Sequence, residues 1–174
     1  LARHFHASDV QTATRVARIL GFISTELTNS LTGEGETRLQ SSECHDESDT
    51  SCGDDTNAFI RGGENLIICP EFFDNSERAQ AGTMLHEISH VDVEGVTHIT
   101  DRAYRHNRAY SQLTTIEALT NADSYENFCR EIFYNRPIES TAPEDAMNDC
   151  SERQRAPMER SMAALERYVD YGIN

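Results

Sequence analysis

The sequence predicts a mainly helical domain with a small β-sheet, an α+β fold. Apolar residues recur at helical spacing over several long stretches, whereas only one short apolar run has the character of a strand. The segments between them are rich in Gly, Ser, Thr and Asp, as loops are. A chain of 174 residues has the length of one ordinary domain and is expected to bury its own core.

The N-terminal half is expected to contain one long helix, a loop and a strand. The helix is expected over residues 9–29, because Ser8 opens a pattern typical of a capping box. Apolar residues then recur at helical spacing, namely Val10, Ala13, Ala17, Leu20, Ile23 and Leu27. Residues 32–57 are polar, which predicts a loop or a short irregular hairpin. Residues 66–69 form an apolar run that Pro70 ends, so a strand is expected there.

Further helices are expected after this strand. One begins at residue 74 or 76 and carries the sequence His-Glu-Ile-Ser-His, and a third covers residues 114–134. Pro157 opens a last helix, whose apolar stripe is Met158, Met162, Leu165 and Val169. We therefore expect a single domain over residues 1–174, in which residues 135–174 form a helical C-terminal extension.

The charge composition excludes several partners. The chain has 30 acidic residues against 15 basic ones, all of them Arg, which leaves a net charge of −15 and a pI of about 4.7. Nucleic acids and anionic membranes are poor partners for so acidic a surface. No apolar run approaches the roughly 20 residues of a membrane-spanning helix. We expect a monomer that binds neither nucleic acid nor membrane.

The spacing of the five cysteines is too wide for the paired ligands of a zinc ribbon, which leaves disulfides or buried thiols. Disulfides persist in oxidising compartments, so a secreted, extracellular protein is expected. Local loop closure favours pairing Cys52 with Cys69 and Cys129 with Cys150, which leaves Cys44 over.

The strongest functional pattern is the H-E-x-x-H motif of residues 86–90. His86 and His90 lie four residues apart on a predicted helix, so both imidazoles project from one face and can bind one Zn²⁺ ion. Glu87 lies beside the first ligand, where a carboxylate can take the proton of a metal-activated water. The motif predicts a zinc-dependent hydrolase.

The third zinc ligand has several candidates. A metzincin would place Gly and His where this chain has Val93 and Val96, so that class is excluded. Glu117 is the candidate of a thermolysin-like arrangement. Asp101 lies 11 residues after His90, with Tyr104 three residues further on, and His98 is its main rival.

The Asp101 arrangement resembles the aspzincins, the deuterolysin family of fungal and bacterial metalloendopeptidases. In that family H-E-x-x-H is followed by G-T-x-D-x-x-Y-G, and residues 98–105 keep the Asp and Tyr of this pattern but not its glycines or its Thr. The run Ala-Leu-Thr-Asn-Ala-Asp-Ser-Tyr at residues 118–125 and the run Cys-Pro-Glu-Phe-Phe at residues 69–73 also look like the family. The resemblance, which spans residues 66–133, implies a zincin-like metalloprotease domain. It also implies that Asp101 is the third zinc ligand and that Tyr104 stabilises the tetrahedral intermediate.

The resemblance extends to specificity. In the aspzincins that are peptidyl-Lys metalloendopeptidases, acids matching Asp123 and Glu126 form the S1′ pocket that holds a lysine ammonium. The resemblance therefore implies a secreted zinc metalloendopeptidase that cleaves protein or peptide substrates before Lys or another basic residue. A protease with that preference would be protected from itself by a chain without lysine. The alternatives are a broad-specificity deuterolysin-like protease and a secreted zinc-binding effector without turnover.

Overall fold

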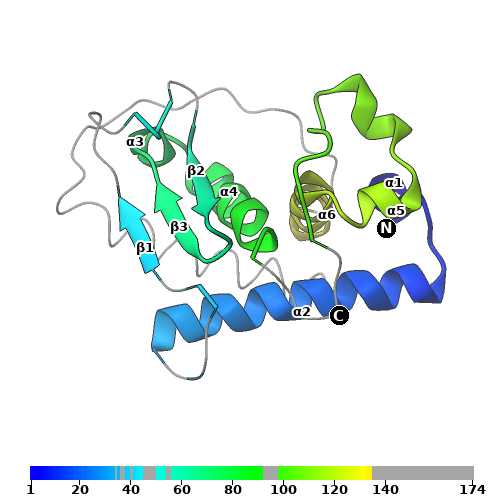
Figure 1. The fold of residues 1–174 in the computed structure, drawn as a ribbon. Helices are drawn as coiled ribbons and strands as arrows, with labels where there is room; N and C mark the ends of the chain where they lie inside the picture. Colours follow the sequence, from blue (N-terminus) through cyan, green and yellow to red (C-terminus); the bar gives the residue numbers. More distant parts are fainter. Residues whose placement is uncertain are drawn as a thin grey trace.

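The computed structural model describes residues 1–33, 35, 38–39, 41–44, 50–53, 56–91 and 98–134. Helices and a three-stranded sheet pack around one apolar core, which confirms the predicted α+β class (Figure 1). The described elements are, in chain order, α1 (Ala2–Phe5), α2 (Val10–Thr32), β1 (Ser41–Cys44), β2 (Ala58–Arg61), β3 (Asn65–Ile68), α3 (Pro70–Phe73), α4 (Glu77–Ser89), the 3₁₀ helix η1 (Arg108–Gln112), α5 (Thr115–Ala118) and α6 (Ala122–Tyr134). None of the described helices is long and apolar enough to cross a membrane.

The sheet has the strand order β1-β3-β2. β2 and β3 form an antiparallel hairpin, whose turn contains Gly62 and Gly63, both with positive φ. β1 pairs in parallel with β3, so its partner lies outside residues 32–57, and the described residues of that range show no irregular hairpin. β2 is the outer strand on one side of the sheet and packs against α4.

The long helix α2 runs along one side of the molecule and packs against α4 (Figure 1). Its cap is Asp9, whose carboxylate accepts a hydrogen bond from the Thr12 backbone N–H at 2.9 Å, one residue later than the capping box expected at Ser8. It ends at Gly33, which adopts the left-handed conformation with φ 68°. The apolar face of α2 packs against α4 and is completely buried at Ile19, Leu20, Ile23 and Leu27.

The single helix expected over residues 114–134 is wrong, because the chain breaks it into α5 and α6. At the break, the Thr100 backbone N–H donates to the Thr120 carbonyl at 3.0 Å, and the Ala122 N–H donates to the Thr100 carbonyl at 3.2 Å. These bonds form an isolated parallel bridge between Thr100 and Asn121. The backbone of Thr100 thus hydrogen-bonds to the Thr120 carbonyl and the Ala122 N–H, which a continuous helix would have paired within itself.

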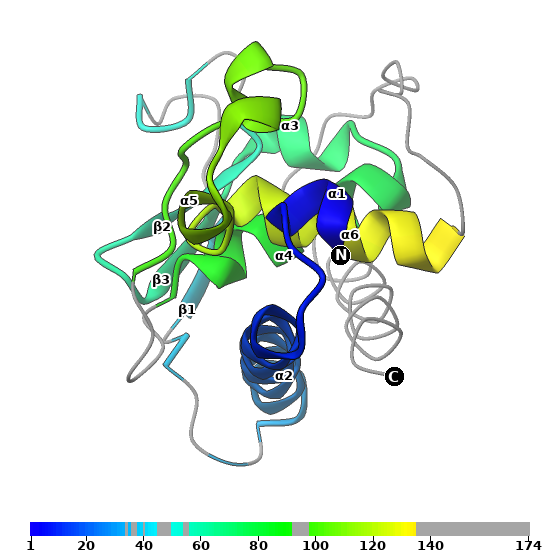
Figure 2. The same cartoon turned by 90° about the vertical axis from the view of Figure 1, so that its right-hand side faces the viewer.

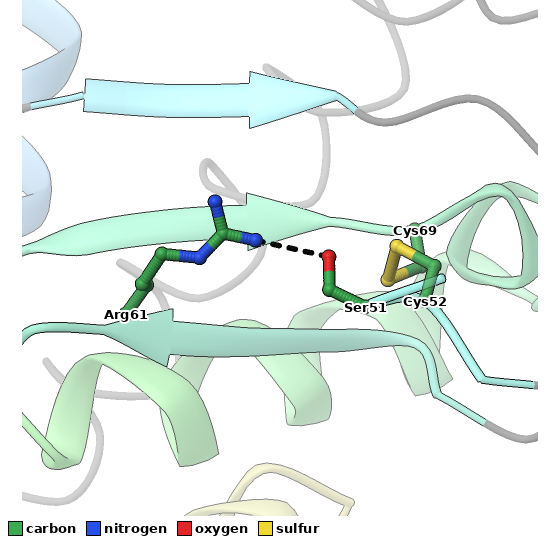
Figure 3. Close-up of a disulfide and its surroundings, with 4 residues drawn as sticks. All are labelled: Ser51, Cys52, Arg61 and Cys69. Carbon is green, nitrogen blue, oxygen red and sulfur yellow. Dashed lines mark hydrogen bonds between the residues drawn. A yellow bond between two sulfur atoms is a disulfide. The ribbon is translucent and has the colours of Figure 1, made fainter. Parts of the chain in front are cut away.

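One predicted disulfide is confirmed and the other is not. Cys52 and Cys69 are bonded and join the turn before β2 to the end of β3, next to a 2.9 Å hydrogen bond from Arg61 to Ser51 (Figure 3). Cys129 is a free thiol with no exposed surface, so its predicted pairing with Cys150 is wrong. The core position of Cys129 on α6 accounts for the error, since a buried thiol packs as a small apolar residue. Cys150, the side chain of Cys44 and the expected C-terminal helices lie outside the described residues.

The short helix α1 lies against α6 (Figure 2). Its His4 is buried, with Nδ1 2.8 Å from the Tyr110 hydroxyl and Nε2 3.0 Å from the Glu131 carboxylate. Burial lowers the pKa of His4, against the opposing effect of the Glu131 carboxylate. His4 is therefore a packing residue that joins α1 to α6.

Candidate active site

The C-terminal turn of α4 carries the H-E-x-x-H residues. Ser76 caps the start of α4, and His90 is the residue at which the helix ends. The Nε2 atoms of His86 and His90 lie 2.8 and 3.3 Å from the same oxygen, Oδ1 of Asp101. The structure thus brings together the two motif histidines and the carboxylate that is 15 residues from His86 in sequence.

Asn121, at the break between α5 and α6, holds the segment that carries Asp101. Its side-chain oxygen accepts hydrogen bonds from the backbone N–H groups of Arg102 and Ala103 at 2.9 and 3.0 Å. Its side-chain nitrogen donates to the Ala103 carbonyl at 3.0 Å. Asn121 has no exposed surface, so these bonds are shielded from water and fix the segment beside α4.

The three side chains suit a zinc ion. Ligand atoms of His86, His90 and Asp101 all lie within 4.8 Å of one another, and two imidazoles with one carboxylate are a ligand set that zinc accepts. The second nitrogen of each ring also has a partner. His90 Nδ1 lies 3.0 Å from the Ile99 carbonyl, and His86 Nδ1 lies 3.4 Å from a carboxylate oxygen of Glu126. These contacts favour protonation at Nδ1 and leave both Nε2 lone pairs for a metal.

The rival ligands lie elsewhere. His98 is exposed, lines the nearby cleft and belongs to none of the metal-ligand groups found among the described residues. Glu117 forms the capping box of α5 with Thr114 and is engaged there through both backbone and side chain.

Glu87 and Tyr104 line the same cleft as the candidate zinc ligands His90 and Asp101. Glu87 is 9 % exposed, and burial raises its pKa to about 7. The ring of Tyr104 stacks on the His86 ring at a centroid distance of 5.8 Å and an interplanar angle of 6°. Tyr104 is 41 % exposed, which leaves this aromatic side chain accessible to a substrate, and partial burial with nearby carboxylates raises its pKa to about 12.

A cleft of about 520 Å³ opens over these residues. Its lining includes three β2 residues, Ala58, Phe59 and Ile60, together with Glu87, His90, Asp101 and Tyr104. Among the described strands, β2 pairs with β3 alone, and three of its residues line the cleft.

Asp123 and Glu126 lie one turn apart on α6 and do not line this cleft. Asp123 accepts hydrogen bonds from the Arg105 backbone N–H at 2.6 Å and from the Asn127 amide at 2.8 Å. Burial, followed by the nearby Glu126 charge, raises the pKa of Asp123 to about 7. Glu126 accepts from Arg130 at 2.6 Å. Burial alone would raise the pKa of Glu126, but contacts with His86 and Arg130 outweigh it and lower the pKa.

Sequence reasoning did not find three of these neighbours. Arg130 lies four residues after Glu126 on one helix, so the i,i+4 spacing was a usable signal. The Ile99 carbonyl had no signal, because any residue carries one. His106 belongs to none of the motifs, and its ring stacks on that of Tyr104 at a centroid distance of 5.8 Å.

An H-E-x-x-H helix whose two histidines lie beside one carboxylate, the candidate third ligand, is typical of zinc metallopeptidases. The family model described as "lysine-specific metallo-endopeptidase", the aspzincin model, matches residues 1–130 of this chain. The chain therefore belongs to the aspzincin family and is a zinc-dependent metalloendopeptidase that acts on peptide substrates. No curated protein and no solved structure matches this chain.

Proposed function

We propose that His86, His90 and Asp101 hold one zinc ion and that Glu87 is the general base of peptide hydrolysis. The observation that carries this proposal is the convergence of the three ligand atoms within 4.8 Å, with Glu87 lining the cleft beside them. When bound, zinc lowers the pKa of water and polarises a carbonyl group.

Glu87 takes a proton from the attacking water and passes it to the leaving amine. A general base works most effectively when its pKa lies near the working pH. Burial raises the pKa of Glu87 toward that range, which favours this role. The Tyr104 hydroxyl donates a hydrogen bond to the carbonyl oxygen as negative charge develops there, and its exposure at the cleft supports this role.

The cleft accommodates an extended peptide. A substrate segment placed along the outer edge of β2 would hydrogen-bond as an additional strand, while its scissile bond lies over the metal ligands. This placement is supported by the β2 residues that line the same cleft as Glu87 and Asp101 and by the lack of a second described partner strand for β2.

We further propose that Asp123 and Glu126 form the S1′ pocket and favour Lys or another basic residue at P1′. Two acids one turn apart and mostly buried offer a strong site for a cation. The family description, lysine-specific metallo-endopeptidase, supports this preference. One observation favours broad specificity instead: Glu126 is already paired with Arg130, and neither acid lines the cleft.

Mass spectrometry of a digested denatured proteome tests activity and specificity together. We expect cleavage sites with basic residues, above all Lys, enriched at P1′, and no cleavage by a zinc-loaded Glu87→Gln variant. Activity that survives this substitution would contradict the role of Glu87. Cleavage without basic enrichment would leave the metallopeptidase intact and support the broad-specificity alternative.

We also propose a secreted monomer with one catalytic domain over residues 1–174, extended by helices in residues 135–174. The Cys52–Cys69 disulfide supports an oxidising compartment, and the family match ending at residue 130 supports the extension. Light scattering tests the monomer. Circular dichroism of a chain truncated after residue 134 tests the extension, since the loss of helical signal should exceed that of a coil segment.

A further inference from the structure

The side of His86 that faces away from Asp101 is occupied by an ion pair. Glu126 Oε2 lies 3.4 Å from His86 Nδ1, and Glu126 Oε1 accepts from Arg130 Nη1 at 2.6 Å. The side chains of His86, Glu126 and Arg130 are 8, 13 and 15 % exposed, so the pair is largely shielded from water. A shielded carboxylate against the second nitrogen of a ligating imidazole orients the ring and makes it a better ligand.

Gly82 makes room for this pair. It lies one turn before His86 on α4, on the face that packs against α6. A Cβ atom at Gly82 would lie 2.7 Å from Glu126 Oε1 and 3.3 Å from Arg130 Cδ. Any larger residue would therefore move the Glu126 carboxylate away from its place beside His86.

We propose that Glu126 is a positioning residue for the proposed zinc ligand His86. Arg130 holds the Glu126 carboxylate in place, and the missing side chain of Gly82 leaves the space that the carboxylate occupies. Arg130 also balances the charge of the carboxylate, so Glu126 stays against His86. The inference rests on the proposed zinc ligands and gives Glu126 a role at the metal centre besides its proposed place in the S1′ pocket.

Zinc affinity is the decisive measurement, made by competition with a chromogenic chelator. We expect Glu126→Gln to raise the zinc dissociation constant about 10- to 100-fold. Arg130→Met should act in the same direction, because it releases the carboxylate. Cobalt substitution gives a second readout, since a reoriented His86 changes the visible d–d absorption of the bound ion.

Gly82→Ala keeps the proposal testable if Glu126→Gln does not fold. Alanine favours the helical conformation more than glycine does, so α4 should remain folded. We nevertheless expect weaker zinc binding and a changed cobalt spectrum. If the folded Glu126→Gln and Gly82→Ala variants bind zinc as tightly as the wild type and give the same cobalt spectrum, the proposal is overturned.

Glu131→Gln is the matched control on the same helix, because the Glu131 carboxylate contacts Arg3, His4 and Arg105 and not the candidate zinc ligands. We expect this variant to bind zinc as the wild type does. Zinc loss in Glu131→Gln as large as in Glu126→Gln would show a general effect of α6 and would overturn the positioning role.

Discussion

His86 has a different neighbour on each side of its imidazole ring. Asp101 lies against Nε2, Glu126 lies against Nδ1, and the Tyr104 ring stacks on its face. Of these three neighbours, only Tyr104 is both exposed and able to donate a hydrogen bond to a substrate. Its hydroxyl can therefore be removed without disturbing the ring stack, which separates the chemical role of Tyr104 from its packing.

Tyr104→Phe should lower kcat roughly 10²-fold or more, as expected for loss of one oxyanion donor. KM and zinc content should stay near the wild-type values, because the ring and the metal ligands are retained. Steady-state kinetics on a quenched fluorescent peptide measures this effect. Tyr110→Phe is the control, since the Tyr110 hydroxyl contacts His4 outside the site. Full kcat in Tyr104→Phe would contradict the proposed donor.

At the scale of elements, the break between α5 and α6 positions the candidate third ligand. The apolar spacing of Ile116, Leu119, Ala122 and Tyr125 runs through the break, which is why periodicity predicted one helix. The helix breaks because Thr100 hydrogen-bonds to the backbone of Thr120 and Ala122. The periodicity of apolar residues gives no information about a hydrogen-bond partner 20 residues away in sequence. Helix α4 and strand β3 were predicted well, because Ser76 and Pro70 are local signals.

Asn121→Ala should lower both stability and zinc affinity. The change leaves the buried N–H and carbonyl groups of Ala103 and the part-buried N–H of Arg102 without their partner, and each buried group costs about 1–3 kcal/mol. The Asp101 segment is then free to shift from α4, so zinc should bind more weakly. Denaturant unfolding and chelator competition measure the two effects.

Asn75→Ala is the control for this prediction. The Asn75 amide donates to Asn57 and to the Glu71 carbonyl, away from the metal ligands. We expect lower stability with unchanged zinc affinity. Equal losses of zinc affinity in both variants would show that Asn121 acts through global stability alone.

At the scale of the whole molecule, the charge composition bears on specificity. All 15 basic residues are Arg, and the net charge is −15. The lack of lysine protects the chain from its own activity only if the enzyme distinguishes Lys from Arg at P1′. A compact Lys ammonium and a planar guanidinium differ enough in shape and hydration for a small acidic pocket to do so.

Thr50→Lys should make the protein cleave itself before residue 50. This residue is an exposed turn position next to the disulfide-linked Cys52, where a protease can reach the backbone. Incubation at high concentration, followed by mass spectrometry of reduced fragments, detects the cut. Thr50→Arg is the matched control and should stay intact. An intact Thr50→Lys protein would count against self-resistance as the reason for the missing lysines.

The sequence by itself determined the reaction class, because His86, Glu87 and His90 are related by a single helical turn. Local spacing is sufficient to place two imidazoles and a base on one helix. Only the tertiary structure decided which of Asp101, His98 and Glu117 lies beside those imidazoles. Contacts between residues distant in sequence depend on how loops close and helices pack, and neither leaves a periodic trace. Packing of α6 against α4 likewise placed Glu126 beside His86, in space left by Gly82. No local sequence pattern predicts this contact.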